Sequence, residues 1–245
     1  MLIHYCSDLH LNKSLYKYPD ITGDVLILAG DICPINEYDL YFKELLEDIS
    51  TRYKHIIYVL GNHEFYYGDI ATDVDIAKEY VKPYNVTILQ NETIVIDDVQ
   101  FIGGTCWTNF NNLDPTTMMH ATKRINDFNR TDYHGQPLTC YDWLELHDAF
   151  AKFLREVDIF THTNIVITHH SPTMLTSSEK FMNNITNGCY CANMEIYMKD
   201  IFYWFHGHQH DGLDLELNRC NIRSNSRGYP NEDCYQTFKV KELLL

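Results

Sequence analysis

The sequence predicts an α/β fold with its functional groups gathered at one edge of a β-sheet. Apolar, strand-like runs alternate with helical patterns from the N-terminus onward, and a polar motif follows each main run directly. Unbroken apolar runs are typical of strands covered on both faces. Because ligands bind outside the carboxyl ends of strands in open α/β sheets, the polar motifs mark the expected site.

Strand, helix and strand are predicted in the first 60 residues. Residues 37–53 carry apolar and aromatic side chains at helical spacing. The apolar runs on either side predict strands at residues 2–6, 24–29 and 55–60.

The middle of the chain changes character. Two alternating runs around Asp97 and Asp98 predict a hairpin. Thr139 and Asp142 have the spacing of a capping box, so a helix with an apolar face is expected from there to residue 157. The roles of the polar stretches 105–136 and 171–199 stay open.

The C-terminal part is predicted to be mainly β-structure, and no boundary divides the chain. One domain over residues 1–245 is therefore the expectation. The expected strands cover residues 164–168, 201–205, 213–217, 221–225 and 235–240.

The charge of the chain limits its partners. There are 19 Lys and Arg against 34 Asp and Glu, a net charge of -15. This argues against a protein that binds long nucleic acid through clustered cations. A small phosphoester stays compatible, because bound metal ions reverse the local potential in a small site.

The N-terminus and the hydropathy pattern predict a cytoplasmic protein, in the host cytoplasm if the chain is of phage origin. No apolar run reaches 18 residues, so no membrane association is expected. No signal peptide is recognisable. The eight cysteines are then expected to be buried thiols, with Cys189 and Cys191 as the tightest pair.

Five short polar motifs follow five predicted strands. Each motif alone is weak, since Gly-Asp and Gly-Asn often form simple turns. Together they crowd carboxylates, an amide and imidazoles at one sheet edge, which is costly unless divalent cations compensate. The motifs are Asp8-Leu-His10, Gly30-Asp31, Gly61-Asn-His-Glu64, His169-His170 and Gly207-His-Gln-His210.

The spacing within the motifs suits two ions. In an extended segment alternate residues face the same way, so Asp8 with His10, and His208 with His210, can each address one pocket. A carboxylate such as Asp31 can bridge two ions about 3.5–4 Å apart. Mixed nitrogen and oxygen ligands favour Mn, Fe, Zn or Ni over Mg or Ca, with Mn preferred here.

The five motifs in this order resemble the calcineurin-like metallophosphoesterase superfamily, over nearly the whole chain. The resemblance implies a four-layer αββα fold, in which two mixed β-sheets form a sandwich flanked by helices. The chain looks closest to a branch of small bacterial and phage phosphoesterases. The segments that carry this likeness are Gly104-Thr-Cys-Trp-Thr108, Asn126-Asp-Phe128, Thr168-His-His-Ser-Pro172 and Asn225-Ser-Arg-Gly-Tyr229.

The resemblance also implies a role for each motif residue. His63 is expected to contact the substrate phosphate and protonate the leaving oxygen, and Glu64 to orient His63. A hydroxide between the two metals is expected to attack phosphorus. The expected metal ligands are Asp8, His10 and His210 on one ion, Asn62, His169 and His208 on the other, and Asp31 on both.

Two departures from the superfamily affect the expected substrate. Leu60 stands where the protein Ser/Thr phosphatases carry a phosphate-clamping arginine, which disfavours that activity. Ser226 replaces a proline of the branch, and Arg227 beside it is a candidate phosphate contact. The other candidate substrate contacts are Asn62, His63, His170 and Tyr229.

Several residues outside the motifs have weaker assignments. Trp107 is expected to pack in the core, and Tyr229 to lie at the edge of the site. Arg124 and Asn126 are candidates for the cleft wall. His170 and His206 adjoin expected ligands, and support of a ligand or contact with substrate are equally plausible for both.

The function expected from this pattern is hydrolysis of a small phosphoester at a site with two divalent metal ions. A phosphodiester, possibly nucleotide-like, is slightly favoured over a monoester because the arginine clamp is missing. Two alternatives stay open: a protein-interaction scaffold on the same fold, and a metal-dependent nuclease. The sequence leaves the oligomeric state open.

Overall fold

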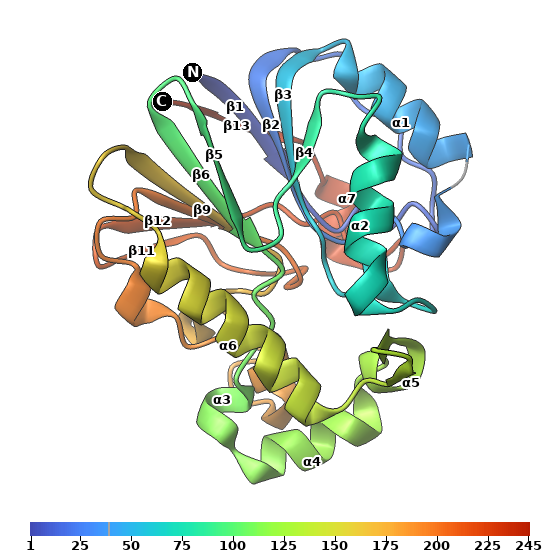
Figure 1. Cartoon of the computed structure of the whole chain (residues 1–245), viewed down its shortest axis with the longest axis vertical. Helices are drawn as coiled ribbons and strands as arrows, with labels where there is room; N and C mark the ends of the chain where they lie inside the picture. Colours follow the sequence, from blue (N-terminus) through green and yellow to red (C-terminus); the bar gives the residue numbers. More distant parts are fainter. Residues whose placement is uncertain (39) are drawn as a thin grey trace.

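Two mixed β-sheets packed face to face form the centre of the structure (Figure 1). The computed structural model describes residues 1–38 and 40–245. The first sheet has the order β13 (Lys241–Leu244), β1 (Leu2–Cys6), β2 (Gly23–Ala29), β3 (Tyr53–Val59) and β4 (Val86–Ile88). The second has the order β11 (Leu215–Leu217), β12 (Cys220–Ser224), β10 (Tyr203–His206), β9 (Thr163–Thr168), β6 (Val99–Gly104) and β5 (Glu92–Ile96).

Most strands are parallel, and the antiparallel pairs lie at sheet edges. β13 runs antiparallel to β1, β5 to β6, and β11 to β12. The parallel core strands β1, β2, β3, β6, β9, β10 and β12 all direct their carboxyl ends toward the same end of the molecule (Figure 1). This is the edge at which the sequence places its polar motifs.

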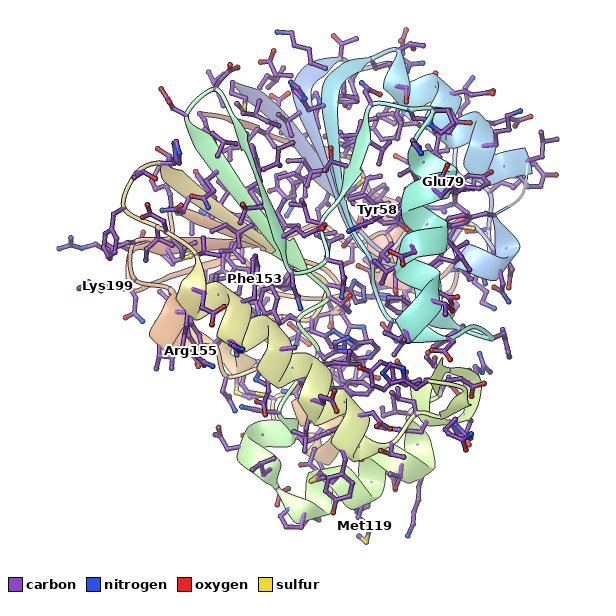
Figure 2. All side chains as sticks on the ribbon, in the orientation of Figure 1. Tyr58, Glu79, Met119, Phe153, Arg155 and Lys199 are labelled. Atoms are coloured by element: carbon purple, nitrogen blue, oxygen red, sulfur yellow. The ribbon has the colours of Figure 1, made fainter. Side chains whose placement is uncertain are left out.

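Alternating side chains along the strands build separate apolar layers. Val25 and Ile27 of β2 face the second sheet, whereas Leu26 and Leu28 face outward. Between the sheets lies a cluster of buried hydrophobic side chains, and both sheets contribute to it. Figure 2 shows Tyr58 inside the molecule and Lys199 at its periphery.

Helices cover both outer faces, which completes the four layers that the family resemblance implies. Helices α1 (Leu40–Ser50) and α2 (Ile70–Val81) lie against the first sheet. Helix α6 (Cys140–Glu156) lies against the second, where Phe150 and Leu154 pack with Trp204. No helix within the described residues is long and apolar enough to cross a membrane.

A small helical region lies between β6 and α6 at the lower end of the molecule (Figure 1). Trp143 of α6 anchors it, because Phe110 and Phe128 both pack against its indole. The short two-stranded sheet β7 (Asp132–Tyr133) and β8 (Gln136–Pro137) follows. The helices of this region are α3 (Phe110–Leu113), α4 (Pro115–Arg124) and α5 (Asp127–Arg130).

Short 3-10 helices fill several connections. The one at Ile185–Cys189 packs on α4, so the two polar stretches 105–136 and 171–199 meet in space. The others cover Ile35–Glu37, His63–Phe65, Met174–Thr176 and Glu195–Tyr197.

The strand prediction is confirmed for every main apolar run but is wrong at the C-terminal end. Residues 235–240 do not form a strand, because the chain forms helix α7 (Asp233–Thr237) before it joins the first sheet as β13. The helical turn brings the Tyr235 hydroxyl to 2.9 Å from the Arg227 guanidinium. The helix predicted over residues 37–53 is shorter, and Asp39 within it lies outside the described residues.

The predicted capping box at the start of α6 is present. Asp142 N–H donates to the Thr139 hydroxyl, and Thr139 N–H donates to the Asp142 carboxylate. These bonds satisfy two of the backbone donors that a helix N-terminus leaves free.

We expect Thr139→Ala to lower the free energy of unfolding by about 1 kcal/mol, because the cap is lost. Thr139→Ser, which keeps the hydroxyl, serves as the control and should stay close to wild type. Urea denaturation measures both. Equal stability of all three proteins would show that the box does not stabilise α6.

Candidate metal centre

The polar motifs that follow five strands lie together at the carboxyl ends of the two sheets. Backbone hydrogen bonds join the loops, since Asp8 N–H donates to Gly30 C=O and His10 N–H to Asp31 C=O. The two ligand loops of the second sheet are joined to each other in the same way, because Gly207 N–H donates to His169 C=O. The residues brought together are Asp8, His10, Asp31, Asn62, His63, His169, His208 and His210.

Their ligand atoms fall into overlapping groups, each within 4.8 Å. One group contains Asp8, His10 and His210, and another contains Asp31, His169 and His208. Asp31 also groups with His10 and His63, so its carboxylate lies between the first two groups. This is the arrangement that a pair of neighbouring cations requires.

The surroundings of His169 show that the site suits a cation. Its Nδ1 lies 2.9 Å from Ala29 C=O, so Nδ1 carries the proton and donates it there. The inward Nε2 faces the Asn62 Oδ1 at 3.1 Å and the Asp31 Oδ1 at 3.3 Å. Three acceptors then face one another, with His208 Nδ1 3.2 Å from the same nitrogen, and a positive charge among them would relieve their repulsion. Gly30 permits this approach, because its φ is +87° and a Cβ there would overlap the His169 ring.

A proton on His169 is one source of that charge. Burial lowers the pKa of His169, but the Asp31 carboxylate more than offsets burial and raises the pKa to about 9. A divalent ion can take the place of this proton, because the same carboxylate and imidazole bind metal in their deprotonated forms.

The group of Asp8, His10 and His210 is arranged in a similar way. His210 directs Nδ1 to the Glu232 carboxylate at 2.5 Å and its Nε2 toward His10 Nε2 at 3.2 Å and Asp8 Oδ1 at 3.4 Å. Burial lowers the pKa of His210, but its bonds to Asp8 and Glu232 raise the pKa to about 10. Burial lowers the pKa of His10 to about 3, so its imidazole is neutral and keeps one acceptor nitrogen.

Four of these residues have left-handed backbone conformations, which side chains other than glycine rarely adopt. Each conformation carries roughly 1–2 kcal/mol of strain. Such strain persists only where the surrounding structure enforces it, and it is typical of functional sites. The residues and their φ angles are Asp8 (52°), His10 (45°), Asp31 (56°) and His208 (64°).

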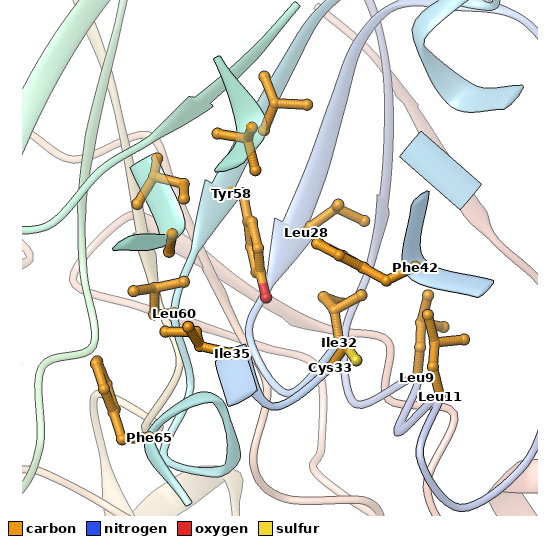
Figure 3. Close-up of a cluster of buried hydrophobic side chains, with 14 of the residues drawn as sticks. Leu9, Leu11, Leu28, Ile32, Cys33, Ile35, Phe42, Tyr58, Leu60 and Phe65 are labelled. Carbon is orange, nitrogen blue, oxygen red and sulfur yellow. The ribbon is translucent and has the colours of Figure 1, made fainter. Parts of the chain in front are cut away.

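Glu64 is the anion that holds the loops in place. Its carboxylate accepts hydrogen bonds from Gly61, Asp31 and Ile32 N–H at 2.6–2.8 Å, and from the Tyr58 hydroxyl at 2.6 Å. Burial, followed by repulsion from Asp31, raises the pKa of Glu64 to about 7. Figure 3 shows the apolar cluster that surrounds Tyr58, which includes Leu28, Ile32, Ile35 and Leu60.

His63 lies beside this site, but Glu64 does not orient it. Within the described residues no hydrogen bond or ion pair joins the two side chains, because Glu64 points into the backbone of the loops. Instead His63 stacks on the Tyr66 ring at 4.1 Å between centroids, and its Nε2 lies 3.3 Å from the Tyr229 hydroxyl. The backbone N–H of His63 donates to Asp31 at 2.9 Å.

Tyr229 lies at the edge of the site, as its sequence context suggested. Its ring stacks on His10 at 4.6 Å between centroids. Its hydroxyl and His63 both border the same cleft. Burial raises the pKa of Tyr229 far above its usual range, so the phenol is a neutral hydrogen-bond donor.

Arg227 is not placed to contact a phosphate. Its guanidinium donates to the carbonyls of Leu9, Ser14 and Leu15 at 2.8–3.1 Å and to the Tyr235 hydroxyl. The side chain is 5% exposed and does not border the cleft. Arg227 therefore ties the C-terminal segment to the loop that carries His10.

His170 also lies behind the site rather than in it. Its ring is fully buried against Trp107 and Trp143, and its Nδ1 lies 3.2 Å from Thr105 C=O. Its ring centroid is 4.4 Å from that of His208. Burial lowers its pKa to about 3, so a neutral His170 supports His208 from below. The expected packing role of Trp107 is confirmed.

His206 likewise lies beneath the loop. It is 1% exposed, and its Nδ1 lies 3.1 Å from Gly207 C=O. Neither His206 nor any cysteine belongs to a potential metal-ligand group in the described chain. Cys189 and Cys191 are buried, as expected for thiols rather than a zinc site.

A cleft of about 620 Å³ opens in front of the ligands. Arg124 and Asn126 line it, as the sequence suggested. Sequence reasoning missed three cleft residues with direct contacts to the site. Tyr190 stacks on His208 at 4.6 Å between centroids, Asp127 accepts a hydrogen bond from Tyr66 at 3.1 Å, and Glu232 binds His210.

Asp127 had a signal in the sequence, because it lies in the Asn126-Asp-Phe128 segment of the phosphoesterase branch. It is 2% exposed, its Oδ1 has no hydrogen-bond partner among the described residues, and burial raises its pKa. Tyr190 and Glu232 lie in irregular segments with no recognisable pattern.

Comparisons with known proteins agree with this geometry. An uncharacterized protein, L509, of Acanthamoeba polyphaga mimivirus is 27% identical over 100% of this chain and 98% of its own length. An uncharacterized metallophosphoesterase, Cj0846, of Campylobacter jejuni is 30% identical over 41% of this chain and 27% of its own length. The crystal structure of phosphopantetheinyl hydrolase (PptH) from Mycobacterium tuberculosis superposes with a TM-score of 0.77 at 17% identity, and covers 99% of this chain and 95% of the other.

The profile of the calcineurin-like phosphoesterase family matches residues 1–212, which contain every candidate metal ligand. The fold, the buried clusters of histidine and aspartate, and this match lead to one conclusion. The chain belongs to the calcineurin-like phosphoesterase family and is a metal-dependent phosphoesterase of that family.

Proposed function

We propose that the chain, acting as one domain, hydrolyses small phosphate esters at a centre of two divalent ions, with phosphodiesters favoured over monoesters. One observation carries the proposal. The inward Nε2 of His169 faces the oxygens of Asn62 and Asp31, and a cation at this point would relieve their repulsion. Asp31 lies between the two ligand groups and is the proposed bridging ligand.

The proposed ligands follow the two groups. One ion takes Asp8, His10 and His210, and the other takes Asn62, His169 and His208. When bound, two such ions activate a water molecule near neutral pH and offset the charge on the phosphoryl group. The mixture of nitrogen and oxygen donors favours Mn, with Fe, Zn and Ni as alternatives.

The remaining residues of the centre hold the substrate and move a proton. His63 presents Nε2 to the cleft and is the proposed donor to the leaving oxygen. The Tyr229 hydroxyl, 3.3 Å from that nitrogen, positions the ring and can bond a phosphoryl oxygen. The stack on Tyr66 restricts the His63 ring to this orientation.

The charges of the cleft favour a diester. In the described part of the chain, two basic side chains border the cleft, Arg124 and Lys180, and both are exposed. Arg227 donates to backbone instead. A monoester carries nearly two negative charges at neutral pH, whereas a diester carries one. A centre without an arginine clamp, and with the buried Asp127 in its wall, suits the smaller charge.

A scaffold without activity is the weaker alternative, because residues able to bind metal occupy all seven ligand positions. A nuclease acting on long nucleic acid is disfavoured by the net charge of -15.

A turnover panel tests the proposed function. Metal-stripped protein would receive Mn, Fe, Zn, Ni or Mg, and each form would be assayed with a monoester, a diester, cyclic nucleotides and a phosphopantetheinyl ester. The last is included because a protein of similar fold is named for it. We expect the highest turnover with Mn and a diester. No turnover with any metal would favour the scaffold.

Replacing the bridging carboxylate should disable the centre. We expect Asp31→Asn to bind fewer than two ions and to lose nearly all turnover, because the amide cannot offset the charge of two cations. Metal analysis after dialysis and the diester assay measure both effects. Asp98→Asn, in an exposed hairpin turn, is the control. Full metal content and full turnover in Asp31→Asn would contradict the two-ion scheme.

Replacing His63 should separate chemistry from metal binding. We expect His63→Ala to keep both ions and to slow turnover by about 10²–10⁴-fold, the usual contribution of a positioned proton donor. The exposed His134 supplies the control variant, His134→Ala. Loss of metal from His63→Ala would make His63 a ligand instead.

A further inference from the structure

We propose that Glu232 is a positioning residue of the metal centre and sets the affinity of one of its two ion sites. The inference rests on the proposed function, because it assigns a role toward the ion held by Asp8, His10 and His210. It concerns a part of the chain that follows the family match, which ends at residue 212.

The contact between Glu232 and His210 determines which nitrogen of the imidazole faces the site. A carboxylate oxygen only accepts, so at 2.5 Å from Nδ1 it requires the proton on that nitrogen. Nε2 then faces Asp8 Oδ1 and His10 Nε2, at 3.4 and 3.2 Å, and is the ring nitrogen left to bind an ion. An imidazole held in this way by a carboxylate is a better metal ligand, since its tautomer and ring orientation are set in advance.

The position of Glu232 is itself held on two sides. The same carboxylate oxygen accepts the Tyr229 N–H at 2.7 Å, so the turn of residues 229–232 aims it at His210. Gly228, with φ at +74°, leaves the room that this turn needs, because a Cβ there would lie 2.6 Å from the Glu232 oxygen.

The segment before the turn is tied to the first ligand loop. Gly228 N–H donates to Asp8 C=O and Arg227 N–H to Ser7 C=O, both at 3.1 Å. Glu232 and the ligand Asp8 are thus held in one hydrogen-bonded unit, although they are 224 positions apart in the sequence. A carboxylate that only added charge to the surface would not need to be held in this position, so the contact with His210 points to a specific role for Glu232.

Asp233 provides a matched control. It is the next residue along the chain, it is exposed, and it borders the same cleft. It makes no hydrogen bond or ion pair with His210 within the described structure, so Asp233→Asn removes the same charge from the same cleft without changing a contact of the imidazole.

Calorimetric titration of Mn into metal-stripped protein tests the inference without an activity assay. We expect wild type and Asp233→Asn each to bind two ions, and the two affinities of Asp233→Asn to equal those of wild type. In Glu232→Gln, one site should weaken by about 10–100-fold while the other is unchanged. Electron paramagnetic resonance at two Mn per protein should then show coupled ions in wild type and mainly single ions in Glu232→Gln.

Glu232→Asp separates position from charge, because it keeps the carboxylate but withdraws it by one methylene. We expect Glu232→Asp also to weaken one site, and a wild-type affinity there would overturn the positioning role. Two wild-type affinities in Glu232→Gln would overturn the inference and leave the proposed function standing. Wild-type protein that binds no divalent ion would overturn both. Circular dichroism confirms that each variant is folded.

Discussion

The crowding of hydrogen-bond acceptors at the ends of five strands is the constraint on which the rest of this structure depends. Imidazoles, an amide oxygen and two carboxylates face one another, and most of them are buried. Such a group repels itself unless positive charge is present. The parallel strands of two sheets supply the rigidity that keeps these acceptors together, and the loops between strand and helix supply the acceptors.

Beneath the acceptors lies a second polar layer that faces the backbone. Glu64 gathers the N–H groups of the two loops that carry Asp31 and Asn62, while the Tyr58 hydroxyl closes its remaining side. The apolar cluster around Tyr58 excludes water from these bonds. Hydrogen bonds within the protein therefore hold the loops that carry the ligands.

The sequence predicted the strands and the ligand positions because both depend on local pattern. Apolar runs such as residues 24–29 carry the strand signal in their own pattern, and motifs that end parallel strands meet at one edge. It misjudged residues whose role depends on distant partners. Glu64 seemed to serve its neighbour His63 but binds backbone, and Arg227 seemed free for phosphate but binds the loop at Leu9. Glu232 had no local signal, since its partner lies 22 residues earlier.

The left-handed ligands have an evolutionary consequence. Asp8, His10, Asp31 and His208 hold conformations in which glycine is unstrained. Replacing one of them by glycine would remove backbone strain and mutual repulsion, which opposes the loss of hydrogen bonds such as that from His63 N–H to Asp31. A lineage that no longer needed catalysis would therefore meet less resistance to losing these residues.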